Sequence, residues 1–241
     1  MIKLGNFFFR HRNYLFPVFY ILMFIPYAHR ITQNYSLMLT LGLTVLILGQ
    51  SVRMLAIGLV YIKRGGKNRR IYAEGLVTEG LFSHSRNPMY VGNVTMILGM
   101  GIMSNSYLYL LLVVPFFYFI YECIIRAEEN YLRGQYGKDF EKYCANVPRW
   151  LPNLKGIGNT LTSQKFDFKK MFYKEYNTTF VWMLGAILVS LFNFYLLKGE
   201  TFCVNHQFYF ISFFVAAAIF YVTVRALKKS ERRAQMRTQQ A

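Results

Sequence analysis

Four ionisable side chains stand close together at the end of an apolar stretch: Glu122, Arg126, Glu128 and Glu129. On a helix, Glu122, Arg126 and Glu129 share a face by their i, i+4 and i+7 spacing, whereas Glu128 points elsewhere. Carboxylates that turn inward at an apolar boundary are costly and are therefore candidates for function. A solvated helix end with an ordinary ion pair explains the same pattern, and the spacing alone leaves both interpretations open.

The acidic residues of the chain are concentrated in two polar stretches, residues 72–90 and 122–152. In a chain of formal net charge +17, this concentration favours a ligand that has a cationic portion. His84 lies in the first stretch and is interpreted as a surface-loop histidine. No second His or Cys stands near enough to complete a metal site, so we predict no bound metal.

The elements that position these residues are predicted to lie in a membrane. Of the 241 residues, 54% are hydrophobic and 18% aromatic, and the apolar residues form long blocks, which excludes a soluble enzyme and a disordered chain. The basic residues bracket these blocks, so the charge does not indicate nucleic-acid binding. Three scattered cysteines indicate neither a disulfide framework nor a zinc site.

The fold class predicted from these blocks is all-α, a polytopic membrane protein of about six transmembrane helices with a cytoplasmic cap. Pro88 fits the first turn of the third span, because proline has no N–H to satisfy there. The six candidate spans are residues 14–28, 36–62, 88–103, 107–125, 178–197 and 208–227.

The distribution of charge predicts the orientation of these spans. Of the 28 Lys and Arg residues, 25 fall on one side, and only Arg30 and Lys198 fall on the other. This places both termini in the cytoplasm, in a bacterial plasma membrane or an endoplasmic reticulum membrane. Arg53 lies inside a span, where it either reaches the headgroups or faces an internal cavity.

Three regions follow along the chain. Residues 1–70 hold the first two spans and a basic loop, residues 71–153 hold the polar stretches and the hairpin of spans three and four, and residues 154–241 hold two further spans and a basic tail. Aromatic and lysine residues alternate over residues 166–176, which predicts an interfacial amphipathic helix.

Several short motifs in residues 70–153 occur in a specific order. They read Leu76-Val77-Thr78-Glu79-Gly80-Leu81-Phe82, Arg86-Asn87-Pro88-Met89-Tyr90-Val91-Gly92, Arg126-Ala127-Glu128-Glu129, Tyr136-Gly137 with Tyr143, and Val147-Pro148-Arg149-Trp150-Leu151-Pro152. This ordered set resembles the isoprenylcysteine carboxyl methyltransferase and phospholipid methyltransferase superfamily of integral-membrane enzymes.

The resemblance implies an S-adenosylmethionine-dependent methyltransferase with a cytoplasmic cofactor pocket. Arg126 matches the arginine that faces the methyl acceptor. For an amine acceptor, which must first lose a proton, Glu122 or Glu129 is the candidate base. The residues that the resemblance assigns to the cofactor are Leu76, Val77, Phe82, Asn87, Pro88, Met89, Tyr90, Gly99, Gly101, Glu128 and Glu129. Helix packing is the alternative explanation for the two glycines.

The implied substrate is an amphiphile, lipid-like or prenylated, that enters from the bilayer, with a carboxylate acceptor favoured. Membrane lipids are the expected surroundings, and nothing in the sequence indicates an oligomeric state. Two features depart from the family pattern: Asn87 stands where the prenylcysteine branch has His, and the last two spans extend beyond the usual core.

Two other functions fit parts of the same pattern. Membrane sterol reductases that bind NADPH share a related cytoplasmic core, although they carry R-D-E where this chain has Arg126-Ala127-Glu128-Glu129. A non-enzymatic membrane protein whose acidic mouth binds a cationic ligand is the other alternative.

Overall fold

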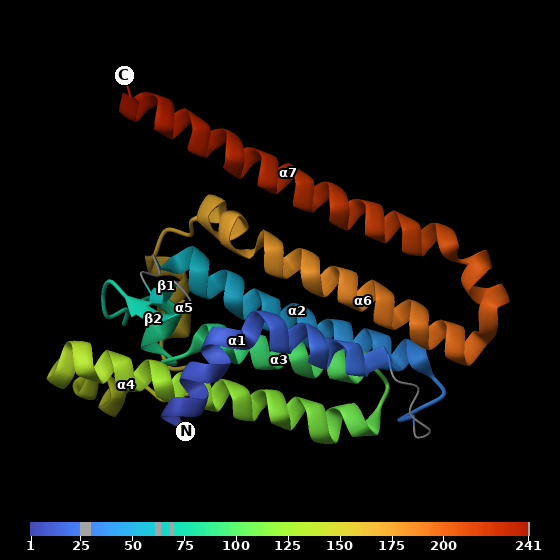
Figure 1. Ribbon diagram of the computed structural model, residues 1–241, viewed down its shortest axis with the longest axis horizontal. Coiled ribbons are helices and arrows are strands. Elements are labelled where there is room, and N and C mark those ends of the chain that lie inside the picture. The colour runs from blue at the N-terminus through green and yellow to red at the C-terminus, as the bar shows by residue number, and fades with distance from the viewer. Residues whose placement is uncertain (25–29, 61–63, 68–69, 241) are drawn as a thin grey trace. The chain divides into compact units, whose positions relative to one another are not determined.

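The computed structural model describes residues 1–24, 30–60, 64–67 and 70–240, and helices dominate it (Figure 1). The helices are α1 (Ile2–Ile21), η1 (Leu22–Phe24), α2 (Tyr35–Leu59), η2 (Gly80–Ser83), α3 (Pro88–Met103), η3 (Tyr109–Val113), α4 (Val114–Asn146), α5 (Ile157–Ser163), α6 (Phe168–Asn205) and α7 (Gln207–Gln240). Strands β1 (Arg64–Lys67) and β2 (Arg70–Ala73) pair antiparallel, with Arg64 opposite Ala73 and Lys67 opposite Arg70.

Contacts divide the chain into two compact units, Met1–Phe166 and Asp167–Ala241. The first unit holds α1 to α5 and the β-hairpin, and with them every residue that the sequence nominates for a site. The second unit is the helical hairpin of α6 and α7, in which Phe180 and Tyr221 stack with ring centroids 4.7 Å apart and Lys169 pairs with Glu231.

The most extensive helix–helix contact joins α2 to α3, which lie side by side (Figure 1). Glycines seven residues apart on each helix face one another: Gly49 opposes Gly92, and Gly42 opposes Gly99. A Cβ atom on Gly49 would lie 2.7 Å from the Gly92 carbonyl oxygen, and one on Gly99 would lie 2.6 Å from the Leu46 nitrogen. Packing at this distance is possible only where neither backbone carries a side chain.

Helix α1 packs against α4 by a similar close approach. A Cβ atom on Gly5 would lie 2.0 Å from the carbonyl oxygen of Cys123, and Phe9, one turn later, is 4% exposed. Phe16 meets Phe117 edge to face, with ring centroids 5.4 Å apart. The N-terminal helix is therefore part of the first unit's core.

The predicted fold class is confirmed. Within the described residues, four helical segments are long and apolar enough to cross a membrane: Tyr35–Leu59, Tyr109–Asn146, Phe168–Asn205 and Gln207–Arg237. Helix α3 is apolar but shorter, and it begins and ends where the sequence predicts. Pro88 occupies its first turn, as expected.

Two predicted boundaries are wrong. The first span was expected at residues 14–28, but α1 begins at Ile2, and residues 25–29 lie outside the described part. The basic residues near the N-terminus do not delay the helix, because lysine and arginine are good helix formers; Arg12 lies over the ring of Phe9, 4.4 Å from its centroid. The predicted interfacial helix of residues 166–176 is not a separate element, because residues 168–176 form the first turns of α6.

Candidate functional site

Two loops far apart in the sequence run side by side beneath the start of α3. The Arg86 N–H donates to the Pro148 carbonyl oxygen at 2.9 Å, and the Asn153 N–H donates to the His84 carbonyl oxygen at 2.9 Å. These bonds bring the Arg86–Tyr90 motif and the Val147–Pro152 motif to the same place. Both motifs therefore meet the acidic segment of α4.

Arg149 joins these loops to α4 through a two-pronged ion pair. Its Nε lies 3.2 Å from Glu129 Oε1, and its Nη2 lies 2.7 Å from Glu129 Oε2. Glu129 is 5% exposed and also pairs with Arg86, whose Nη1 lies 3.2 Å from Oε1. Hydrogen bonding to Glu129 raises the pKa of Arg149 above its usual value, so the guanidinium stays charged.

Glu122 lies on the same face of α4 as Glu129, as its spacing predicts. Its Oε1 accepts from Arg126 Nε at 2.6 Å and from Arg149 Nη1 at 3.0 Å, and its Oε2 accepts from Trp150 Nε1 at 2.8 Å. Arg126 is the more exposed partner, with 44% of its side chain accessible. The i, i+4 ion pair is present, but it does not lie at a solvated helix end, because α4 continues to Asn146 and Glu122 also pairs with Arg149.

Glu128 points to a different side of α4, as predicted, and contacts the start of α3. Tyr90 donates to Glu128 Oε1 at 2.7 Å, and Glu128 is 8% exposed. The Tyr90 ring lies against Tyr121, with centroids 5.3 Å apart, and Tyr121 lies against Phe16 of α1 at 5.5 Å. A line of aromatic rings therefore connects this carboxylate to the N-terminal helix.

The turn before α3 is held by the neighbouring loop. Asn87 is 3% exposed, and its Nδ2 donates to the Arg149 carbonyl oxygen at 3.2 Å. Ser85 Oγ donates to the Trp150 carbonyl oxygen at 3.0 Å. Pro88 is buried and Met89 half-buried beside Asn87. An amide at position 87 thus fixes the backbone that presents Arg149.

Three further nominated residues are Phe82, Leu76 and Val77. Phe82 is fully buried, and its carbonyl oxygen accepts from Tyr143 Oη at 2.6 Å. Leu76 packs against the apolar cluster of Leu132, Phe140, Tyr143 and Val147, and Val77 is buried. That cluster forms because α4 bends at Gly137, whose φ of 47° and ψ of −120° favour glycine.

The two nominated glycines take part in helix packing. Gly99 faces Gly42 and Leu46 of α2, whereas a Cβ atom on Gly101 would lie 2.8 Å from Leu110 and 3.0 Å from Val114. Both glycines are covered by protein and are not brought together with Glu128 and Glu129. Arg53, which by sequence either reaches the lipid headgroups or faces an internal cavity, is 8% exposed and donates to Asn93 of α3.

The expectation for His84 is wrong, because the residue is buried at 5% exposure. Its Nδ1 donates to the Asn153 carbonyl oxygen at 2.6 Å, and its Nε2 lies 2.8 Å from Thr160 Oγ1. The ring therefore links the loop before α3 to α5. A histidine between two serines carries no sequence signal for such a role.

Sequence reasoning assigned no role to three residues of the ion-pair cluster: Arg86, Arg149 and Trp150. Each lies inside one of the motifs named above. The sequence signal that points to partners from elsewhere is that the carboxylates of this segment of α4 outnumber its one arginine, Arg126. Arg86 and Arg149, which come from distant segments, supply the further positive charge. Across residues 1–24, 30–60, 64–67 and 70–240, no group of three or more His, Cys, Asp or Glu side chains could hold a metal ion.

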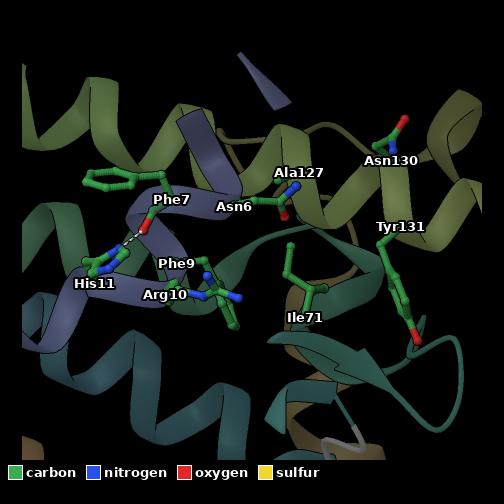
Figure 2. Close-up of a pocket in the computed structure, with 9 residues that line it drawn as sticks. All are labelled: Asn6, Phe7, Phe9, Arg10, His11, Ile71, Ala127, Asn130 and Tyr131. Atoms are coloured by element: carbon green, nitrogen blue, oxygen red, sulfur yellow. Dashed lines mark hydrogen bonds between the residues drawn. The ribbon is translucent and has the colours of Figure 1, made fainter. Parts of the chain in front are cut away.

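A pocket of about 660 Å³ opens beside this cluster, between α1, β2 and α4 (Figure 2). Helix α4 contributes Ala127, Asn130 and Tyr131, which share one face by their i, i+3 and i+4 spacing. Helix α1 contributes residues between Asn6 and His11, and β2 contributes Ile71. The volume lies within the range of small-molecule sites.

Comparison with known proteins decides which family carries these motifs. A family model described as phospholipid methyltransferase matches residues 37–139, which include the Asn87–Tyr90 turn and the acidic segment of α4. The cobalt-zinc-cadmium resistance protein CzcN of Cupriavidus metallidurans is 30% identical over 193 residues, 77% of this chain and 83% of its own length. The chain belongs to the isoprenylcysteine carboxyl methyltransferase and phospholipid methyltransferase superfamily.

A second similar protein is the nickel-cobalt-cadmium resistance protein NccN of Alcaligenes xylosoxydans xylosoxydans. It is 33% identical over 79 residues, which is 33% of this chain and 37% of its own length. No solved structure matches the chain at a significant level. The family is one of membrane methyltransferases, and the apolar helices of this chain agree with an integral-membrane member.

Proposed function

We propose that this protein transfers a methyl group from S-adenosylmethionine to an amphiphilic, lipid-like or prenylated acceptor at the cytoplasmic face of the membrane. The observation that carries the proposal is the 2.7 Å hydrogen bond between Tyr90 and Glu128. It joins the Pro88-Met89-Tyr90 turn to the acidic segment of α4, two motifs that lie 38 residues apart and that both fall within the family match.

The residues around Glu128 fit the chemistry of this cofactor. S-adenosylmethionine carries a sulfonium cation, an ammonium group, a ribose diol and a flat adenine. A carboxylate held by one tyrosine keeps acceptor capacity for the ammonium or the diol, and the half-buried ring of Tyr90, backed by Tyr121, offers a flat wall. Glu129 is engaged by Arg149 and Arg86, so its part is to position the loops.

The cofactor, when bound, supplies an electrophilic methyl group. In the transfer, the bond from carbon to the acceptor atom forms as the bond from carbon to sulfur breaks, and sulfur keeps the electron pair. Such an in-line displacement depends chiefly on positioning and on exclusion of water. The ion pairs of Arg149 with Glu122 and Glu129 hold the two loops and α4 in one arrangement, as that positioning requires.

A carboxylate acceptor suits this site better than an amine. A carboxylate is already nucleophilic and needs only an orienting cation, and the exposed guanidinium of Arg126 is the candidate for that cation that the sequence nominates. An amine must first lose a proton to a base. Glu122 already accepts hydrogen bonds from Arg126, Arg149 and Trp150, which stabilise its ionised form and weaken it as a base.

A labelled-transfer assay tests this proposal. Purified protein in detergent is given S-adenosylmethionine with a radioactive methyl group and either N-acetyl-S-farnesylcysteine, which offers a carboxylate, or phosphatidylethanolamine, which offers an amine. We expect base-labile label on the carboxylate substrate and loss of transfer in Glu128→Gln. Transfer to the amine alone would contradict the carboxylate assignment, and transfer to neither would contradict the proposed function for these acceptor classes.

A further inference from the structure

The pocket between α1, β2 and α4 has a polarity opposite to that of the acidic segment beside it. Among the described residues that line it, the polar ones are Asn6, Arg10, His11 and Asn130, and none is Asp or Glu. The other walls are the aromatic rings of Phe7, Phe9 and Tyr131 with Ile71 and Ala127 (Figure 2). A guanidinium among aromatic walls suits an anion that carries an apolar body.

The position of the pocket on α4 relates it to Glu128. Successive residues on a helix turn by about 100°. Ala127, Asn130 and Tyr131 therefore form one arc of α4, with Glu128 next to Tyr131 at one edge and Arg126 next to Asn130 at the other. Glu128 thus borders the pocket.

The α1 wall is fixed to the rest of the site. Gly5 and Phe9 pack against α4, and Phe16 contacts Tyr121, which in turn contacts Tyr90. His11 Nδ1 donates to the Phe7 carbonyl oxygen at 2.9 Å, which holds the imidazole against the Phe7 ring (Figure 2). The helix that forms this wall is therefore joined, through Phe16 and Tyr121, to the tyrosine that binds Glu128.

We infer that this pocket binds the anionic group of the methyl acceptor, with Arg10 as the residue that recognises the anion and the aromatic walls holding the adjoining apolar chain. This inference rests on the proposed function and names the acceptor's binding site within it. A carboxylate and a phosphate monoester share the required charge. The cofactor, a cation, would occupy the Glu128 side.

Binding of three probes to the purified full chain tests the inference. The probes are N-acetyl-S-farnesylcysteine, its uncharged methyl ester, and dihexanoylphosphatidic acid. Arg10→Gln should weaken binding of the acid roughly tenfold, the value of one charge-assisted hydrogen bond at a solvent-accessible site, and leave the ester unchanged. Arg133→Gln, which removes an exposed cation of α4 outside the pocket, is the matched control and should change neither.

A second variant tests the pocket without altering charge. Asn130 is exposed at the pocket wall, so Asn130→Trp should fill the space and weaken acid and ester alike. The phosphatidic acid measurement shows whether the anion is a phosphate or a carboxylate, according to which probe Arg10→Gln weakens more.

Parallel titration with S-adenosylhomocysteine separates the two proposals. If wild-type protein binds it and Arg10→Gln does not distinguish acid from ester, or Asn130→Trp binds all probes normally, the inference is overturned while the proposed function stands. If wild-type protein binds no S-adenosylhomocysteine, the proposed function fails. Acid-selective loss in Arg10→Gln with unchanged S-adenosylhomocysteine affinity is the supporting result.

Discussion

Arg149 Nη2 lies 2.7 Å from Glu129 Oε2, and the same guanidinium reaches Glu122 Oε1 at 3.0 Å. One side chain from the loop after α4 therefore spans two turns of that helix. This contact holds the loop against the acidic segment of α4. The Asn87 turn is attached to the same loop, since Asn87 donates to the Arg149 carbonyl oxygen. The arrangement of the whole site depends on this pair.

Replacing Arg149 tests its structural part. Arg149→Lys keeps the charge but loses the planar two-pronged geometry, so it should lower the free energy of unfolding by about 2 kcal/mol. Arg126→Lys is the matched control, because Arg126 is exposed and makes a single i, i+4 pair, and it should change stability by less than about 0.5 kcal/mol. Thermal unfolding in detergent measures both, and equal losses would contradict the assignment.

The two adjacent carboxylates should differ in what their loss affects. Glu128→Gln should weaken S-adenosylhomocysteine binding by about 1.5–3 kcal/mol, since it removes a charged acceptor, and should leave stability nearly intact. Glu129→Gln should instead destabilise the fold, because it leaves Arg149 and Arg86 without their shared carboxylate. Calorimetry and thermal unfolding on both variants separate these effects, and identical behaviour of the two variants would refute the division of roles.

The sequence predicts the parts of this site that depend on local geometry. The shared face of Glu122, Arg126 and Glu129, the divergence of Glu128 and the start of α3 at Pro88 all follow from helical spacing or from the chemistry of proline. Whether Arg149 reaches Glu129 depends on how a distant loop returns to α4. That return requires the bend at Gly137, which spacing alone does not locate.

Errors in the predicted spans have a comparable origin. The predicted spans stop short of the flanking charged residues, yet Lys3 lies inside α1 and Lys169, Lys170 and Lys174 lie inside α6. Lysine and arginine are good helix formers, so their charge marks a polar surface without ending the helix. Asp167, which accepts from the Lys170 N–H at 2.8 Å, is the actual start signal of α6.

Glycine substitution distinguishes a packing role from a cofactor role for Gly99. Gly99→Ala places a Cβ atom 2.6 Å from the Leu46 nitrogen, so it should destabilise the α2–α3 contact by about 1–3 kcal/mol. S-adenosylhomocysteine affinity per folded molecule should stay unchanged. Gly134→Ala on α4 meets no atom within 4 Å and should be neutral or stabilising by up to about 1 kcal/mol. Lost affinity with normal stability in Gly99→Ala would restore the cofactor role.

Cysteine labelling tests the proposed orientation. Tyr107 is 46% exposed and Glu74 is also exposed, so both positions suit a labelled cysteine. Ser104, near Tyr107, is buried and does not suit one. In a variant whose three native cysteines are replaced by alanine, Tyr107→Cys should react with an impermeant reagent in sealed cells. Glu74→Cys should react only after permeabilisation. The opposite pattern would place both termini outside.

Calorimetry of the purified full chain tests most directly whether it binds S-adenosylmethionine at the Glu128–Tyr90 contact. S-adenosylhomocysteine and NADPH are titrated in parallel into wild-type protein and Glu128→Gln. We expect saturable binding of S-adenosylhomocysteine to the wild type and no binding of NADPH. In the variant, binding of S-adenosylhomocysteine should be at least tenfold weaker, since roughly 1.4 kcal/mol corresponds to tenfold in affinity. Saturable binding of NADPH, or S-adenosylhomocysteine affinity unchanged by Glu128→Gln, would contradict this expectation.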